Sequence, residues 1–169
     1  RPDGPTSLAP SSTGRSTGIK ALRSSTSRAR CRDAAPARDR INAAIKNSGF
    51  KPPVKGHRKV IVSLAPADIK KEGTNFDLAI ALAYLLASGE IKFNPTKKIF
   101  LGELALNGEL RPIKGALLLS KKAGELGFEE IYLPTDNALE AALIRGVTIF
   151  GCANLRQIIN HLSPSPVEK

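Results

Sequence analysis

The segment Asn75–Gly89 constrains the fold of this chain more than any other. Its sequence, NFDLAIALAYLLASG, has the length of an ordinary helix and is apolar almost all the way round. A helix of that kind has no broad polar face for water and must be covered by other elements. We therefore expect Asn75–Gly89 to be a helix packed inside a folded domain.

The residues around this segment alternate between helical and strand patterns. Ala37–Ser48 has one apolar face and ends at Gly49, which predicts a helix with a glycine stop. Lys59–Ala65 is a β-branched run typical of a buried strand. Further helices are expected at Gly115–Leu126, Asp136–Arg145 and Asn154–Leu162, and further strands at Glu130–Leu133 and Val147–Phe150. The alternation predicts an α/β (α+β) fold.

A hairpin is expected at Asn107-Gly108. This dipeptide lies between two strand-like runs, Lys98–Leu106 and Glu109–Ile113. Asn-Gly between such runs is the strongest short-range hairpin signal, because both residues tolerate the positive φ that the turn needs. We expect two continuous antiparallel strands here.

The first 36 residues differ in composition from the rest. Of residues 1–40, 24 are Ser, Thr, Pro, Gly or Ala, and this quarter carries +6 of the net charge of +11. Such a segment buries too little apolar surface to offset the entropy of ordering. We therefore expect a disordered or non-native Arg/Ser/Pro-rich segment at 1–36, a folded domain at 37–162 and a linker-like tail at 163–169.

Several classes of site have no signature in the sequence. There is no P-loop and no GxGxxG after a strand, so no nucleotide site is indicated. His57 and His161 lack a second metal ligand at helical spacing, and Cys31 and Cys152 fit neither a disulfide framework nor a metal-ligand spacing. The longest apolar run is about half of a bilayer span. We expect a soluble cytoplasmic protein with no metal, no cofactor and no membrane contact.

Two charged segments are candidate motifs. APADIKKEGTNFDL, residues 65–78, leads into a helix whose first turn carries Asp77, where the helix dipole favours a carboxylate. GELALNGELRPIKG, residues 102–115, is a hairpin followed by a helix start. Residue types alone fit a charged loop and turn as well as a functional site. The motif residues are Lys71, Glu72, Gly73, Asp77, Gly102, Glu103, Asn107, Gly108, Pro112, Lys114 and Gly115.

The order and spacing of the two segments resemble those of a known family. The resemblance extends to the upstream helix RDRINAAIKNSGF and to the later stretch IYLPTDNALEAALIRGVTIFGCANLRQIINHL. The chain from about residue 37 to 163 is similar to the N-terminal domain of the ComM/YifB magnesium-chelatase-like (ChlI-like) AAA+ proteins, a domain related to the Lon proteolytic domain. The resemblance implies a ribosomal-protein/GHMP-kinase type of fold with a left-handed βαβ crossover. Residues 1–36 depart from the family pattern, so we hypothesise an out-of-frame start and a fold that lacks its first strands.

The Lon kinship implies positions for a catalytic Ser/Lys pair. Asn75 holds the expected serine position and Leu117 the expected lysine position. An amide is not a competent acyl-transfer nucleophile and a leucine takes no proton, so this mechanism is absent. A substitute pair remains an alternative. It would join a hydroxyl of Thr74, Ser63 or Ser120 to an amine of Lys71, Lys114 or Lys122.

The resemblance implies a non-catalytic domain of an ATP-driven hexameric DNA helicase that acts in branch migration during natural transformation. ATP and Mg²⁺ would belong to the family's ATPase domain. The domain would serve subunit contact or DNA guidance. The alternatives are an active Lon-like serine peptidase and an independent basic DNA-binding module. The candidate DNA contacts are Lys51, Lys55, Arg58 and Lys59.

Overall fold

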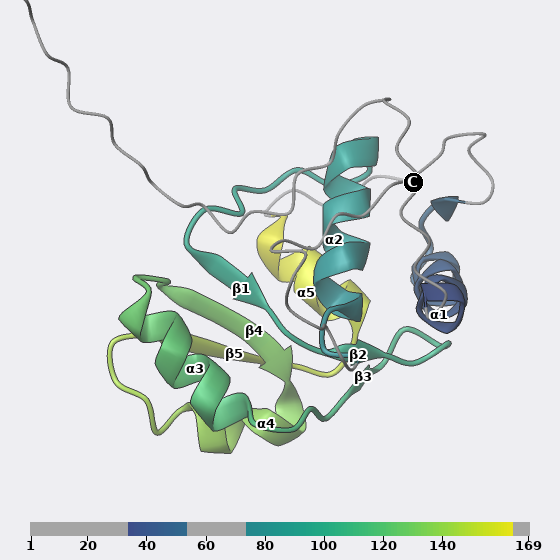
Figure 1. Cartoon of the computed structure of the whole chain (residues 1–169). Coiled ribbons are helices and arrows are strands. Elements are labelled where there is room, and N and C mark those ends of the chain that lie inside the picture. The colour runs from purple at the N-terminus through teal and green to yellow at the C-terminus, as the bar shows by residue number, and fades with distance from the viewer. Residues whose placement is uncertain (1–33, 54–73, 164–169) are drawn as a thin grey trace, which may run out of the picture.

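A computed structural model describes residues 34–53 and 74–163 of the chain (Figure 1). Its centre is a parallel three-stranded sheet in the order β1-β4-β5. The register pairs Ile99 with Ile131 and Ile131 with Ile149. A two-stranded antiparallel sheet, β2-β3, lies beside one end of it. The α/β class expected from the sequence is confirmed.

The helices and strands have the following bounds. The helices are α1 Ala34–Asn47, α2 Asp77–Ser88, α3 Ala116–Glu125, α4 Thr135–Ala141 and α5 Leu155–Leu162. The strands are β1 Lys98–Phe100, β2 Glu103–Leu104, β3 Leu110–Arg111, β4 Glu130–Pro134 and β5 Thr148–Cys152.

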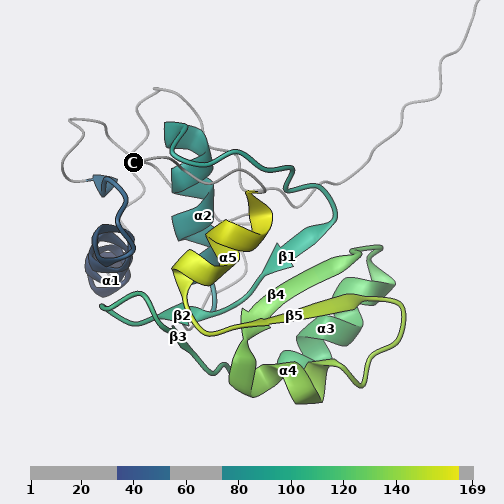
Figure 2. The same cartoon turned by 180° about the vertical axis from the view of Figure 1, so that it is seen from behind.

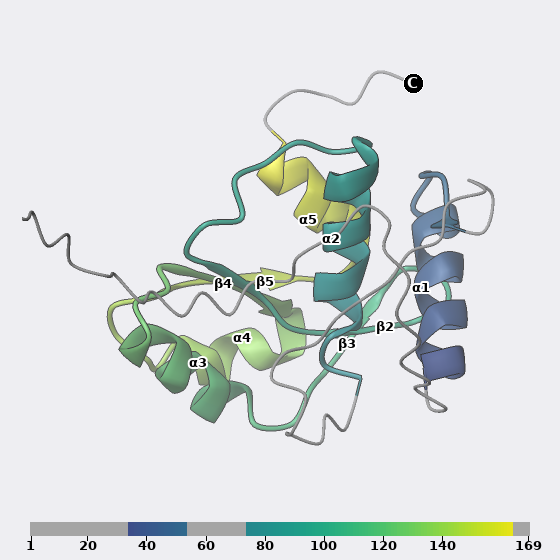
Figure 3. The same cartoon turned by 45° about the horizontal axis from the view of Figure 1, so that its top comes forward.

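The two faces of the parallel sheet carry different cores, because successive side chains of a strand point to opposite faces. Ile99, Ile131 and Ile149 pack on one face with residues of α3 and α4. Phe100, Tyr132 and Phe150 pack on the other face with α2 and α5. The views from behind and from above show the same layering, with α3 and α4 below the sheet and α5 above it (Figures 2 and 3).

The apolar helix is buried along one face, and the rest of its surface is mostly half-buried. α2 contacts α1, β1 and β2, and its Leu78, Ala81, Leu82 and Leu85 are buried. Gly89 ends the helix in the left-handed conformation, with its N–H bonded to carbonyls of the last turn. The core around α2 joins α1, α5 and the aromatic face of the sheet.

The hairpin at Asn107-Gly108 is confirmed, but both of its strands are shorter than predicted, and of the two turn residues Gly108 alone has a positive φ. β2 and β3 pair antiparallel across this turn. The continuous strand Lys98–Leu106 was wrong: it is broken at Leu101 and Gly102 into β1 and β2, which belong to different sheets. The reason is that Gly102 bonds the start of α2, its N–H to the Asn75 carbonyl and its carbonyl to the Leu78 N–H.

Other boundaries differ by a few residues. α1 begins three residues before Ala37, and β5 continues two residues beyond Phe150 to Cys152. α4 ends at Ala141, not Arg145, because a tighter turn, with the Ile144 N–H on the Ala141 carbonyl, returns the chain to β5. The predicted strand Lys59–Ala65 and the segment 1–33 lie outside the described residues. Within 34–53 and 74–163, no helix combines the length and apolar character needed to cross a membrane.

Candidate functional site

A nearly buried ion pair joins α1 to the start of α2. Arg40 Nε donates to Asp77 Oδ2 at 2.9 Å, and Arg40 Nη2 donates to Oδ1 at 3.3 Å. The Asp77 side chain is 3% exposed and that of Arg40 is 22% exposed. Two parallel bonds from a planar guanidinium fix the angle as well as the distance between the partners. This pair therefore holds α1 against α2.

Burial governs the titration of this pair. Removal from water raises the pKa of the Asp77 carboxyl, and the hydrogen bonds from Arg40 and the Leu104 backbone oppose that rise only in part. Asp77 in turn raises the pKa of the Arg40 guanidinium. The sequence predicted Asp77 as a helix-dipole carboxylate and a motif residue without a partner, whereas the structure gives it a cation 37 residues away.

Glu103 links two further elements to the same region. Its carboxylate accepts a hydrogen bond from Thr74 Oγ1 and lies 3.7 Å from Arg111 Nη1. Thr74 precedes α2, and Arg111 is the last residue of β3. We call Arg40, Thr74, Asp77, Glu103 and Arg111 the polar cluster. It connects α1, α2, β2 and β3.

The polar cluster lies beside the position that resembles the Lon serine. Asn75 directly follows Thr74, and its carbonyl accepts the Gly102 N–H at 3.0 Å. The structure therefore brings together Asn75, Asp77, Gly102 and Glu103, which come from the two separate motif segments. Lys71, Glu72 and Gly73 lie outside the described residues, and so does Ser63.

The Asn107-Gly108 turn is packed on the end of α1. Asn47 Nδ2 donates to the Leu106 carbonyl at 2.7 Å. Gly108 has a φ of +89°, and a Cβ there would lie 2.9 Å from Ser48 Oγ. Both the turn and the close approach require glycine. These two motif residues thus have a structural role in seating the hairpin on α1.

The third motif group lies at the start of α3, held by a residue the sequence did not single out. Asn137 Oδ1 accepts the Ile113 N–H at 2.8 Å, and Asn137 Nδ2 donates to the Ile113 carbonyl at 3.0 Å. This pairing fixes the turn that contains Pro112 and Lys114. Lys114 is exposed, and Gly115 has a φ of 76° at the helix start. Leu117, the second residue of α3, is half-buried.

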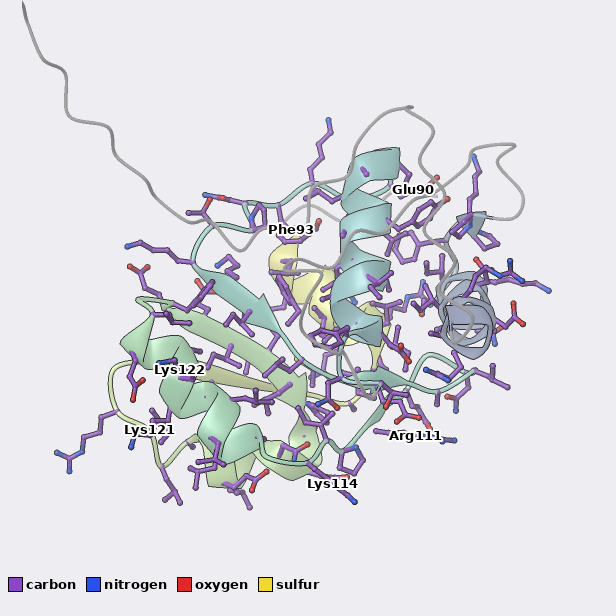
Figure 4. All side chains as sticks on the ribbon, in the orientation of Figure 1. Glu90, Phe93, Arg111, Lys114, Lys121 and Lys122 are labelled. Atoms are coloured by element: carbon purple, nitrogen blue, oxygen red, sulfur yellow. The ribbon has the colours of Figure 1, made fainter. Side chains whose placement is uncertain are left out.

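The described residues do not bring together the substitute hydroxyl–amine pairs. The Ser120 hydroxyl is buried, and no hydrogen-bond partner contacts it within the described part of the chain. Lys122 is on the same helix but is exposed and paired with Glu125. Lys114 is also exposed (Figure 4). Thr74 bonds a carboxylate, Glu103.

Other candidate residues are partly described. Lys51 is exposed, and the Tyr84 hydroxyl donates to its carbonyl at 3.1 Å. Lys55, Arg58, Lys59 and His57 lie outside the described residues. Among residues 34–53 and 74–163, no group of three or more His, Cys, Asp or Glu side chains could hold a metal ion.

A shallow depression of about 200 Å³ lies where β4 and β5 end. It is lined by Glu109, Leu110, Thr135, Asp136, Ala153 and Asn154. The carboxyl ends of parallel strands are common ligand positions in α/β proteins. The two carboxylates on its rim, Glu109 and Asp136, are both exposed. No local sequence pattern indicates this depression, because its residues come from three separate segments.

Arg40, Arg111 and Asn137 are site residues that the sequence did not indicate. Arg40 reaches Asp77 from another helix, and Asn137 reaches Ile113 from 24 residues away. Neither spacing belongs to a local motif.

The chain matches one protein family over most of its length. The profile of the family described as subunit ChlI of Mg-chelatase matches residues 32–137. The match includes α1, α2, the β2–β3 hairpin, α3 and β4. It therefore covers the polar cluster, the hairpin turn and the start of α3.

Individual relatives agree with the family match. YifB of Escherichia coli is 44% identical over 111 residues, which cover 65% of this chain and 21% of that protein. Competence protein ComM of Haemophilus influenzae is 36% identical over 131 residues, 75% of this chain and 24% of that protein. DNA repair protein RadA of Streptococcus pneumoniae is 28% identical over 91 residues, which cover 54% of this chain and 21% of that protein. The chain thus matches about a quarter or less of the length of these relatives.

Proposed function

We propose that this chain, which belongs to the family of subunit ChlI of Mg-chelatase and is a relative of ComM and YifB, is a non-catalytic N-terminal domain of a ComM-like AAA+ DNA helicase. The domain serves subunit contact or DNA guidance for a motor that acts in branch migration during natural transformation. ATP and Mg²⁺ are bound by the ATPase domain of such a protein, in the cytoplasm. The names of two relatives, a competence protein and a DNA repair protein, support a role near DNA.

One observation carries the non-catalytic part of this proposal. At the position that resembles the Lon nucleophile, the polar groups are engaged in holding elements together. Asp77 is paired with Arg40, Glu103 is bonded by Thr74, and the Asn75 carbonyl is bonded by Gly102. A Ser/Lys mechanism needs a hydroxyl within hydrogen-bond reach of an unprotonated amine. In the polar cluster the Thr74 hydroxyl is bonded to the carboxylate of Glu103, and the cations are the guanidinium groups of Arg40 and Arg111.

A peptidase assay tests the non-catalytic part. The purified chain is incubated with an unfolded protein, and the digest is analysed by mass spectrometry. We expect no cleavage products. The double variant Asn75→Ser/Leu117→Lys, which installs the Lon-type residues, is run in parallel. Cleavage by the original chain that is abolished by Thr74→Ala or Lys114→Ala would overturn the proposal in favour of an active Lon-like peptidase.

A DNA-binding titration tests DNA guidance. Fluorescence anisotropy of labelled single-stranded, duplex and branched DNA is measured from 50 to 200 mM salt. Binding through phosphates makes affinity fall with salt, with a log–log slope of about −0.9 per contact on duplex. Lys51→Gln should reduce both affinity and slope, whereas Lys92→Gln, another exposed lysine, serves as the matched control. Absence of binding at the lowest salt removes DNA guidance and leaves subunit contact.

A further inference from the structure

β5 forms an outer edge of the parallel sheet. In the order β1-β4-β5 it pairs with β4 on one side, and no other strand of the described residues lies on its other side. Figure 2 shows β5 as the outermost strand of the sheet. Its two faces are covered, one by α4 at Gly151 and the other by α5, where the ring centroids of His161 and Phe150 are 4.6 Å apart. The strand is therefore fixed in place, while its outer edge is left open.

The open edge of β5 consists of four backbone groups. The Thr148 N–H donates to the Glu129 carbonyl at 2.8 Å, so the backbone of Thr148 points toward β4. Successive residues of a strand alternate in direction, so Ile149 and Gly151 point both their N–H and their carbonyl away from β4. Within the described part of the chain, no hydrogen bond is made to these four groups. Two donors and two acceptors are therefore available to another chain.

β5 lacks the features that protect edge strands from pairing. Its sequence, TIFGC, contains no charged residue and no proline, and its register with β4 runs over five residues without a bulge. The outer strand on the opposite side of the sheet, β1, contains Lys98 and follows Pro95 and Lys97. Charged residues, prolines and bulges are the means by which proteins prevent pairing at an edge. Their absence from β5 indicates that this edge is used for pairing.

The chemistry of the edge selects an extended polypeptide as its partner. Donors and acceptors that recur every two residues match the backbone of another strand, as in the addition of a strand to a sheet. Nucleic acid fits less well, because phosphate oxygens accept hydrogen bonds and would leave the carbonyls of Ile149 and Gly151 unpaired. Along the chain, the nearest charged side chains are Arg145 and Arg156, three and four residues outside β5. A strand that pairs with β5 therefore meets no charged residue of the strand itself.

We propose that the outer edge of β5 pairs with an extended segment of a neighbouring copy of this chain, in a head-to-tail arrangement. This proposal specifies the subunit contact in the proposed function and rests on it. In a head-to-tail contact two different surfaces meet, so each copy accepts one neighbour at β5 and donates a segment to the next, as a ring requires. Pairing of β5 with β5 would instead end at a dimer. Four backbone groups make a small contact, so association of this chain is weak and concentration-dependent.

The first experiment measures amide hydrogen exchange by NMR in the whole 169-residue chain without DNA, at 20 and 500 µM. The amides of Ile149 and Gly151 should exchange rapidly at the lower concentration and at least threefold more slowly at the higher one. The amides of Thr148, Phe150 and Cys152 point toward β4, so they are the internal control and should exchange slowly at both concentrations. Rapid exchange of Ile149 and Gly151 at both concentrations, or equal protection at both, overturns the proposal.

The second experiment places a charge on the edge and measures self-association by sedimentation velocity from 1 to 500 µM. The original chain should form species larger than a dimer. Thr148→Lys should weaken this association at least fivefold, because a lysine on an edge strand opposes the approach of another strand. Thr96→Lys is the matched control, since Thr96 is also an exposed threonine but lies in the loop before β1. Association that ends at a dimer, or an equal effect of the two substitutions, overturns the proposal.

The two experiments separate this proposal from the proposed function. Self-association without protection of Ile149 and Gly151 would overturn pairing at β5 and leave a subunit contact elsewhere on the domain. Neither measurement depends on DNA binding or on peptidase activity, so failure here is distinguishable from failure of the proposed function.

Discussion

The side-chain amide of Asn137 pairs with both backbone polar groups of Ile113, at 2.8 and 3.0 Å, inside the folded domain. Both residues are buried. The amide thereby supplies the two hydrogen bonds that a neighbouring strand would make to the backbone of Ile113, in the turn that leads into α3. Because a buried backbone group without a partner is costly, this side chain stabilises the turn that leads into α3.

Asn137→Ala should destabilise the domain by about 2–4 kcal/mol, because it leaves the Ile113 N–H and carbonyl without their partner. Urea unfolding followed by circular dichroism measures the change. Asn160→Ala is the matched control, since Asn160 is exposed on α5. That control should stay within about 0.5 kcal/mol. Equal losses for the two variants would contradict the structural role of Asn137.

Arg40→Met should cost about 3–5 kcal/mol at pH 7, because it leaves the buried Asp77 carboxylate without its cation. The loss of unfolding free energy caused by Arg40→Met should become smaller as the pH falls. The pKa of Asp77 is already raised by burial and rises further without Arg40. A carboxyl with a raised folded-state pKa contributes stability that is present below its unfolded pKa and is lost as pH rises through the folded value.

Urea unfolding at pH 7, 6, 5 and 4 tests this pH dependence. Arg38→Met is the control, because Arg38 is on the same helix but is exposed and pairs with the exposed Asp39. We expect the control to show little loss at any of these pH values. A loss of unfolding free energy in Arg40→Met that becomes larger as the pH falls to 4 would contradict this prediction.

The sequence predicted local elements well and the connections between them poorly. The Asn107-Gly108 hairpin and the buried helix depend on neighbouring residues, so their patterns were sufficient. The break at Gly102 was missed because it arises from backbone bonds to Asn75 and Leu78, more than twenty residues earlier. In a continuous run such as KIFLGELAL, nothing local distinguishes one strand from two.

The candidate site shows the same division. Asp77 and Glu103 were predicted as motif residues through a family resemblance, but their partners Arg40 and Thr74 were not assigned to them. Side-chain hydrogen bonds across 29 or 37 residues depend on tertiary packing and have no fixed sequence spacing.

Gly151→Ala should destabilise the domain by about 1–3 kcal/mol, because α4 lies directly on β5 at this point. A Cβ on Gly151 would be 2.8 Å from the Ala138 Cβ and 3.4 Å from the Thr135 Cα, neither of which can rotate away. In Gly102→Ala the new Cβ would meet the tip of the Leu110 side chain, which can move, so its cost should be smaller. Urea unfolding compares the two variants.

A double-mutant cycle identifies the cause of the Gly151 effect. Ala138→Gly removes the atom that the new methyl group meets, so Gly151→Ala should cost less in that background than in the original chain. The coupling should be favourable even though Ala138→Gly alone loses about 1 kcal/mol of helix propensity. Strict additivity of the two substitutions would show that the contact is not the cause.

Cys152 should be protected from alkylation in the folded chain. Burial raises the pKa of its thiol to about 11, and the thiolate is the reactive form. At pH 8 a thiol of ordinary pKa, about 8.5, is roughly a quarter ionised, whereas one of pKa about 11 is about 0.1% ionised. In a Cys31→Ser variant, iodoacetamide should therefore label Cys152 at least about a hundredfold more slowly without urea than in 8 M urea, and the native rate should rise about tenfold per pH unit from pH 8 to 10. Mass spectrometry of timed samples gives both rates, and equal labelling with and without urea would show that Cys152 is accessible rather than packed beneath α5.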